Sequence, residues 1–323
     1  MKYLDFHSND AAMNLAAEYY ITECDPFSGA DICWFWRTVP TVVIGKNQVA
    51  QAEVNLPYLE ERGIRLVRRH SGGGTIYSDP NNLMFSMVTK SADEGINFRK
   101  FTTPIIDLFH SWGIPATHSG RNDIFLHGKK LSGNAQFHHN GFTVHHGTML
   151  IDSDFEALER AINPSDEKIR ANGVSSVREH VINLKPYLPS FVSESGLEVA
   201  LRDSLCDGAV SFTAAQIEAI STLASERFDT WEILYGKAPK FTVTRTRRLS
   251  GGTVSASLDI HRGVIRAVQF FGDFFGDASP MEEALKGIPY TREDILAALS
   301  DIPLPHAMKK EELCAFLTDV NGR

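Results

Sequence analysis

Three consecutive glycines, residues 72–74, lie just downstream of the arginine pair Arg68-Arg69. Glycine has no Cβ, so its backbone can adopt positive φ and let a ligand lie against it. Successive backbone amides in such a turn form a concave site for a phosphate or carboxylate, and arginine adds a planar fork of donors. Alone, the run favours an ordinary glycine-rich turn with surface arginines. It has neither P-loop nor dinucleotide-binding spacing.

Three further polar positions need one explanation: Asn82, the pair Asn122-Asp123, and Lys130. A pocket that collects a lysine, an arginine, backbone amides and a carboxylate suits the activation of a carboxylic acid by a nucleotide. Its cations and amides would hold the phosphate and stabilise developing negative charge. Each residue also has a plainer interpretation. Asp123 can be a turn or cap residue. Lys129 and Lys130 can be a solvated pair, of which strand alternation lets only one face inward.

Histidines and cysteines give weaker signals. His145 and His146 are neighbours on a predicted strand, so at most one can line a pocket, and 138–139 is predicted to be a solvated turn. No histidine pair has metal-ligand spacing within a helix, so no protein metal cage is predicted. No cysteine lies between Cys33 and Cys206 and no Gly-x-Ser-x-Gly motif occurs, so covalent catalysis is not expected.

The predicted elements place these residues near strand ends. Strands at 64–67 and 83–88 would enclose the glycines as a hairpin. Trp34 and Trp36 share one face of a strand, where plain core packing competes with a role in a ligand wall. The other strands predicted in this half are 32–36, 41–45, 120–126, 128–137 and 142–151, and the helices are 9–20, 55–62, 97–112, 155–162, 194–206 and 214–228.

Length and composition bound the class of protein. A chain of 323 residues with 43% hydrophobic and 22% charged residues is typical of a globular protein with about two domains. The net charge of −8 disfavours general nucleic-acid binding, although Arg65, Arg68 and Arg69 would form a local basic pocket. There is no apolar run that could cross a bilayer and no signal core. The four scattered cysteines favour reduced thiols in a cytoplasm.

The best candidate for a domain boundary is the run 236–240, which contains Gly236 and Pro239. We therefore predict a first domain over 1–236, a linker over 237–243 and a small α+β domain over 244–323. Its strands are predicted near 241–247, 252–261 and 263–271, with a hairpin turn at 261–263. Two helices, one from 281 and one over 291–299, would finish the chain.

Taken in order, the motifs resemble those of lipoate–protein ligases. The catalytic motifs are 68–77, 120–123, 130–135 and 145–148, and the segments 175–184, 231–241 and 272–276 resemble later parts of two-domain members. The likeness covers essentially the whole chain. It implies an α+β fold: a mixed β-sheet catalytic domain of biotin/lipoate ligase type with flanking helices, plus a small α+β C-terminal accessory domain.

The resemblance also implies a reaction in two halves. Lipoate (or octanoate) and ATP with Mg²⁺ would first give lipoyl-adenylate and pyrophosphate. The lipoyl group would then pass to a lysine of a lipoyl domain, in an acyltransferase subunit of a 2-oxoacid dehydrogenase complex or in the glycine-cleavage H protein. No nucleic acid or membrane partner is expected. Such an adenylate is a mixed anhydride with a good leaving group, so no enzyme nucleophile is required.

The family's functional residues carry over motif by motif. The resemblance implies that Lys130 is catalytic and contacts both the acyl carbonyl and the phosphate. It implies adenylate contacts from Arg69, Gly74, Thr75, Ile76, Tyr77, Asn82, Asp123 and Lys130. It implies a lipoyl-side wall of Ser71, Gly72, His146, Thr148 and Trp36. Mg²⁺ would arrive with ATP, near Asp123. His70, Ser78 and Asn81 depart from the family pattern at the predicted pocket rim, where they bear on acyl-chain preference.

Three alternatives stand beside this interpretation. An octanoyl or lipoyl transferase of the same fold would work without ATP but needs a pocket cysteine, which the gap between Cys33 and Cys206 argues against. A biotin ligase has a different glycine-rich motif. A non-catalytic lipoate-binding module would have lost Lys130 or the glycine run, and both are present.

Overall fold

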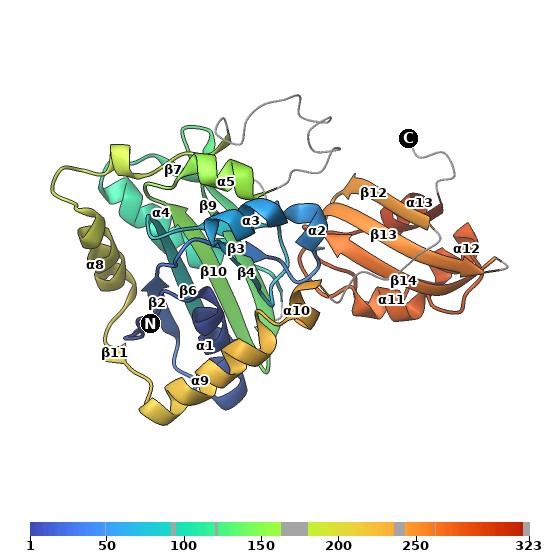
Figure 1. Cartoon of the computed structure of the whole chain (residues 1–323), viewed down its shortest axis with the longest axis horizontal. Coiled ribbons are helices and arrows are strands. Elements are labelled where there is room, and N and C mark those ends of the chain that lie inside the picture. Colours follow the sequence, from blue (N-terminus) through green and yellow to red (C-terminus); the bar gives the residue numbers. More distant parts are fainter. Residues whose placement is uncertain are drawn as a thin grey trace.

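The computed structural model describes residues 1–48, 50–91, 95–119, 122–162, 180–235, 243–261 and 263–318. Two bodies of unequal size lie side by side in it (Figure 1). The larger is built on a mixed eight-stranded sheet and a three-stranded sheet, and the smaller on a second three-stranded sheet. The predicted architecture of a mixed sheet with flanking helices plus a small α+β unit is confirmed.

The eight-stranded sheet is the frame of the larger body. Its strands are β1 (Lys2–Leu4), β2 (Ile32–Trp36), β6 (Asn82–Lys90), β7 (Ala116–Ser119), β8 (Asp123–Leu126), β9 (Lys129–His139), β10 (Phe142–Leu150) and β11 (Ala209–Val210). Their order is β11-β1-β2-β6-β10-β9-β8-β7. The pairs on either side of β1 are parallel, and those from β2 onward are antiparallel.

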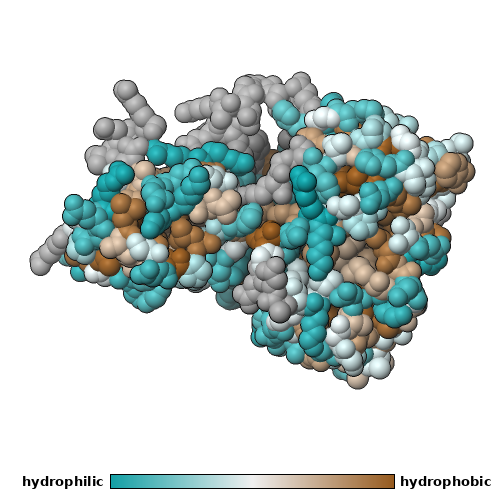
Figure 2. Space-filling view, turned by 180° about the vertical axis from the view of Figure 1, so that it is seen from behind, coloured by the Kyte–Doolittle hydropathy of each residue, from teal (hydrophilic) through white to brown (hydrophobic). Residues whose placement is uncertain are grey.

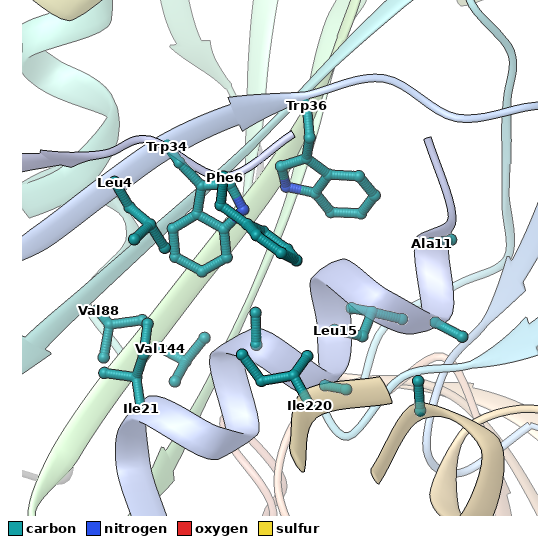
Figure 3. Close-up of a cluster of buried hydrophobic side chains, with 14 of the residues drawn as sticks. Leu4, Phe6, Ala11, Leu15, Ile21, Trp34, Trp36, Val88, Val144 and Ile220 are labelled. Atoms are coloured by element: carbon teal, nitrogen blue, oxygen red, sulfur yellow. The ribbon is translucent and has the colours of Figure 1, made fainter. Parts of the chain in front are cut away.

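Helices cover both faces of this sheet, which explains why β2 is buried at all five positions. They are α1 (Ala11–Cys24), α4 (Phe98–Ser111), α8 (Glu194–Leu205) and α9 (Ala214–Arg227). Trp34 and Trp36 pack with α1 and α9, whereas Cys33 and Phe35 pack with α4 and α8. Figure 3 shows the two tryptophans projecting from β2 toward α1. The shared face predicted for them is confirmed.

Helix ends follow the sequence signals. Asp10 is the N-cap of α1, and its side chain accepts a hydrogen bond from the Ala12 amide. Asn97 caps α4 in the same way through the Lys100 amide. These contacts satisfy amides that have no partner within the helix. The remaining helices of the larger body are α2 (Ala50–Glu53), α3 (Leu56–Arg62), α5 (Phe155–Ala161), the 3₁₀ turn η1 (Lys185–Tyr187) and α10 (Trp231–Tyr235).

The glycine run does not form the predicted hairpin. It joins β4 (Arg65–Arg68) to a strand that was not predicted, β5 (Ile76–Ser78). Both flank β3 (Thr41–Ile44) in a separate sheet of order β4-β3-β5, β4 in parallel and β5 antiparallel. The chain therefore crosses over the end of β3 before it enters β6 in the large sheet. The hairpin prediction was wrong because strand pairing over this distance depends on contacts that local patterns do not encode.

The smaller body pairs β12 (Val243–Leu249), β13 (Gly252–His261) and β14 (Val264–Gly272) into an antiparallel sheet. The hairpin predicted between the last two is confirmed. Helices α11 (Ser279–Ala284) and α12 (Arg292–Ala298) were expected, but α13 (Lys310–Thr318) was not. Leu313, Cys314, Phe316 and Leu317 of α13 are buried in the core of this body. The chain thus ends in one helix more than predicted.

The predicted boundary run 236–240 and the loop 172–178 lie outside the described residues. No described helix is long and apolar enough to cross a membrane. Polar and apolar residues are intermixed on the face of the molecule seen in Figure 2.

Candidate active site

A cavity lies between the Gly-rich turn, defined here as residues 71–75, and the strands β2, β6, β9 and β10. The predicted site residues that line it are Trp36, Arg69, Gly74, Thr75, Ile76, Lys130, His146 and Thr148. Residues predicted to bind the adenylate and residues predicted to bind the lipoyl group therefore line the same cavity. Of the four clusters expected to share a pocket, the Gly-rich turn with Arg69, Asn122 and Lys130 line this cavity, whereas Asn82 does not.

The other predicted site residues lie behind the wall or beside it. Tyr77 is buried in the core with β3 and α3. Asn82 is fully buried and contacts the Tyr77 carbonyl and the Ser153 hydroxyl. Ser71 is 1% exposed, and Gly72 faces the smaller body. These side chains shape the wall from outside, since none of them lines the cavity.

Lys130 enters the cavity from β9 and is 2.8 Å from Asp123 Oδ1 through its Nζ. Its side chain is 39% exposed, so the ion pair is open to solvent and the amine is accessible. A Cβ at Gly133 would lie 2.9 Å from both Cε and Nζ of Lys130, so glycine makes room for the lysine stem. Lys129, its neighbour on the strand, does not line the cavity. The inward lysine is thus Lys130, held by Asp123.

Arg69 is enclosed by the turn it was expected to assist. Nη1 donates to the Val43 carbonyl at 3.2 Å, and Nη2 donates to the carbonyls of Gly72 and Gly74 at 2.7 Å each. Nε donates to the Ser71 hydroxyl at 3.0 Å. Burial lowers the pKa of this guanidinium to about 10. Arg69 therefore binds backbone oxygens and sets the shape of the turn.

The local basic pocket predicted from Arg65, Arg68 and Arg69 was wrong. Arg65 pairs with Asp10 at 2.7 Å and with Asp229 at 3.2 Å. Arg68 donates to five backbone carbonyls, those of Gly45, Lys46, Gln48, Ile233 and Leu234. The three arginines point to different partners because each one satisfies oxygens of a different segment. Arg68 and Arg69 are each 5% exposed, which also overturns the expectation of surface arginines.

The two neighbouring histidines face opposite sides of β10, as predicted. His146 lines the cavity, with Nδ1 at 2.9 Å from Glu18 Oε2 and Nε2 at 2.7 Å from the Ser71 hydroxyl. His145 is fully buried on the other side, stacked on Phe101 at 4.6 Å between ring centroids. Burial holds the pKa of His145 well below its ordinary value. His138 and His139, predicted as a turn, belong to β9 and are half-buried.

The positions that depart from the family pattern do not line the cavity. His70 stacks on Tyr19 at 4.8 Å between centroids. Ser78 accepts a hydrogen bond from the Thr38 hydroxyl at 2.9 Å. Asn81 is exposed in the turn before β6. None of the three lies in the cavity wall, and of them Ser78 belongs to the small sheet, so their bearing on acyl-chain preference stays a prediction.

Seven lining residues were not predicted: Leu15, Val43, Met84, Gly133, Asn134, Ala135 and Gly147. Gly73 and Asn122, which also line the cavity, belong to the glycine run and the polar pair predicted for the pocket. The polar and small ones belong to the recognised motifs and could have been found there. Gly147 is needed because a Cβ would lie 2.4 Å from Asn134 Oδ1 and from the ring of Phe85. For the apolar residues, the sequence has no signal that distinguishes a residue in a cavity wall from a residue in the hydrophobic core.

The smaller body covers the outer side of the Gly-rich turn. The Phe274 carbonyl accepts a hydrogen bond from the Gly73 amide at 3.1 Å. Phe275 is fully buried against Phe98 and Ala135. A Cβ at Gly72 would lie 2.2 Å from the Phe274 carbonyl oxygen, so this close approach requires glycine. Three residues of the turn thus take part in the contact between the two bodies.

Comparisons with known proteins agree along the chain. Residues 10–204 match the family model of the lipoyl protein ligase A/B catalytic domain, and 238–318 match that of the bacterial lipoate protein ligase C-terminus. The lipoate-protein ligase LplJ of Bacillus subtilis is 37% identical over 309 residues, which cover 92% of this chain and 93% of that protein. The chain therefore belongs to the lipoate–protein ligase family, in its two-domain form.

Solved structures agree with the fold. LipL1 of P. falciparum, solved in complex with lipoate, has a TM-score of 0.82 at 21% identity and covers 98% of this chain and 99% of its own. A bipartite ligase of Thermoplasma acidophilum, studied with its E2 lipoyl domain, has a TM-score of 0.65 at 29% identity, over 75% of this chain and 98% of its own. A lipoate-protein ligase A bound with ATP has a TM-score of 0.64 at 27% identity, over 73% and 99%.

Proposed function

We propose that this enzyme activates lipoate with ATP in the cavity beside Lys130 and passes the lipoyl group to a lysine of a lipoyl domain. The observation that carries the proposal is Lys130 itself, a partly exposed amine in a cavity bounded by a turn of glycines. Among the residues that line this cavity there is no cysteine. That favours an adenylate over the acyl-enzyme of an ATP-independent transferase.

In the first half-reaction a lipoate carboxylate oxygen attacks the α-phosphorus of ATP, and pyrophosphate leaves. The Gly-rich turn supplies backbone amides, and Lys130 supplies a positive charge for the phosphate oxygens. In this assignment Gly74, Thr75 and Ile76 contact the nucleotide, and Arg69 acts by holding the carbonyls of Gly72 and Gly74. Tyr77 and Asn82 act from behind the wall.

In the second half-reaction the acceptor lysine attacks the acyl carbonyl, and AMP leaves. Lys130 stabilises the charge that develops on the carbonyl oxygen, an electrostatic role worth a few kcal/mol in comparable sites. Trp36, His146 and Thr148 form the lipoyl-side wall. Ser71 and Gly72 support that wall from the turn.

Mg²⁺ is proposed to enter with ATP. Among the described residues, no group of three or more histidine, cysteine, aspartate or glutamate side chains could hold a metal. Mg²⁺ is commonly held by one or two carboxylates together with substrate phosphates. Asp123, next to Lys130, is the carboxylate that fits this pattern, and the ion would neutralise phosphate charge.

The proposed acceptors are lipoyl domains of 2-oxoacid dehydrogenase acyltransferase subunits and the glycine-cleavage H protein. Support comes from the archaeal relative that was studied with its E2 lipoyl domain. The four cysteines are unpaired, in keeping with the cytoplasmic location expected from the sequence.

We also propose the domain limits 1–236 and 244–323, with the linker 237–243 between them. The gap between the two matched family models, 205–237, supports a break near this position. Movement of the smaller body between the half-reactions is part of the proposal, because its present contact covers the turn that would hold the nucleotide.

The test is an assay with lipoate, ATP, Mg²⁺ and a purified lipoyl domain, in which the mass of the acceptor is read. A mass increase of one lipoyl group is expected only when ATP is present. Lipoate-dependent exchange of pyrophosphate into ATP tests the first half-reaction separately. Absence of exchange together with transfer from an acyl-carrier thioester would instead establish the ATP-independent transferase.

A further inference from the structure

Glu18 lies in the middle of α1 with its carboxylate turned into the sheet and 1% of its side chain exposed. A buried carboxylate is costly unless it is paired or hydrogen-bonded. Its two oxygens lie 3.0 and 2.9 Å from His146 Nδ1. The Ser86 hydroxyl donates to Oε1 at 2.5 Å and accepts from Trp36 Nε1 at 3.0 Å. The carboxylate is thus linked to two residues of the cavity wall.

The hydrogen bonds continue beyond His146 to the Gly-rich turn. His146 Nε2 lies 2.7 Å from the Ser71 hydroxyl, which accepts a hydrogen bond from Arg69 Nε at 3.0 Å. Arg69 in turn holds the turn carbonyls of Gly72 and Gly74. We call this chain of contacts, Glu18–His146–Ser71–Arg69, the buried relay. It is a continuous polar connection from α1 to the turn.

The carboxylate of Glu18 determines which atoms donate and which accept along the relay. A carboxylate accepts only, so it holds a proton on His146 Nδ1. When the ring is neutral, Nε2 then accepts the Ser71 hydroxyl proton, which leaves a Ser71 lone pair for Arg69. An amide at position 18 can donate as well as accept, and it carries no charge. The order of donors along the relay would then be lost.

The distances within the relay are those of a serine–histidine–acid triad. Ser71, however, is 1% exposed and does not line the cavity, whereas His146 and Arg69 do. A hydroxyl behind the wall cannot attack a substrate in front of it. The geometry therefore indicates positioning and not nucleophilic catalysis.

We propose that Glu18 is a positioning residue of the ligase, which acts through His146 and Ser71 to keep Arg69 and the Gly-rich turn in the shape that binds the nucleotide. This inference rests on the proposed function. Glu18 does not line the cavity, so any effect that it has on the Gly-rich turn must pass through His146 and Ser71, whereas an effect through Trp36 would pass through Ser86. That requirement separates the relay from a general loss of packing.

The experiment measures lipoate-dependent ATP–pyrophosphate exchange in the full chain, with kcat and the KM for ATP determined separately. Glu18→Gln, which keeps the size of the side chain, is expected to lower kcat/KM for ATP about tenfold or more, because small displacements of binding groups have large kinetic effects. Ser71→Ala, which removes one hydroxyl, breaks the same relay. The double variant is expected to be no worse than Ser71→Ala alone.

The matched control is Thr22→Val, also on the buried side of α1 and 2% exposed, but outside the relay. It is expected to retain wild-type exchange even if its melting temperature falls. Additive losses in the double variant would overturn the proposal. Full kcat/KM in Ser71→Ala would do so even if Glu18→Gln failed to fold, and so would an acyl group found on Ser71 by mass spectrometry. No exchange by the wild-type chain would instead refute the proposed function.

Discussion

The two sides of the Gly-rich turn are held in different ways. On the inner side, buried charges and hydrogen bonds tie it to the sheet, with Glu18, His146, Ser71 and Arg69 each at most 6% exposed. On the outer side, the smaller body touches it through a carbonyl, a phenylalanine ring and, nearby, an exposed ion pair. A buried polar network can hold one geometry, whereas contacts between domains of one chain commonly allow relative motion. The difference suggests a stable inner wall and a removable outer cover.

The largest effect is expected on the inner side, at Lys130. Lys130→Ala should lower lipoylation about a hundredfold or more, because it removes the charge that faces the reacting carbonyl and phosphate. The measurement is the initial rate of mass gain by a lipoyl domain. Lys129→Ala is the matched control, since that side chain does not line the cavity. Near-normal activity of Lys130→Ala would remove this residue from the mechanism.

The second largest effect is expected on the outer side, from a variant that breaks the contact with the smaller body. Phe275→Ala removes a ring that is fully buried against Phe98 and Ala135, at a cost of about 3–5 kcal/mol typical of buried aromatic residues. The smaller body should then leave the turn, which small-angle X-ray scattering would register as a larger radius of gyration. Phe191→Ala, at a side chain 77% exposed, is the control. An unchanged radius of gyration for Phe275→Ala would show that other contacts hold the smaller body against the turn.

A third prediction concerns pH and His145, on the face of β10 opposite the cavity. Burial keeps the pKa of His145 well below its ordinary value, so the folded state excludes a proton that the unfolded state binds. The free energy of unfolding should therefore fall as the pH drops below about 6.5, by up to about 1.4 kcal/mol per pH unit. Denaturant titrations at pH 7 and pH 5 measure this. His145→Gln should be less stable overall but less sensitive to pH, and an identical pH dependence would exclude His145 as its source.

The smallest effect is expected at the exposed pair Lys46–Asp277, 3.1 Å apart across the two bodies. Burial raises the pKa of Asp277, but hydrogen bonds from Ser279 and the charge of Lys46 outweigh it and lower the pKa overall. The ion pair should therefore stabilise the contact between the two bodies above the ordinary aspartate pKa. This stabilisation should be lost as the pH falls through the lowered pKa of Asp277. Asp277→Asn should weaken docking by less than about 1 kcal/mol, measured by scattering at low and high salt. A change as large as that of Phe275→Ala would make the ion pair the main anchor.

Much of the fold could be predicted from local signals. The bounds of β2 and β13, the cap at Asn97 and the placement of His145 and His146 on opposite faces of a strand all follow from short-range patterns. The ordered motifs likewise placed Lys130 and Thr148 correctly in one cavity. Local patterns failed where the partner lies far away in the chain, as at β5, which pairs with β3, and at α13, which completes the core of the smaller body.

The sequence by itself determined the class of chemistry, because a glycine run, an inward lysine and a carboxylate in family order are sufficient to indicate an acyl-adenylate site. Only the tertiary structure decided how those residues are used. Arg69 turns to backbone carbonyls instead of the open cavity, and Glu18, unremarked in the sequence, joins His146 and Ser71. The physical reason is that a buried charge must find partners, and those partners come from segments as distant as 128 residues along the chain.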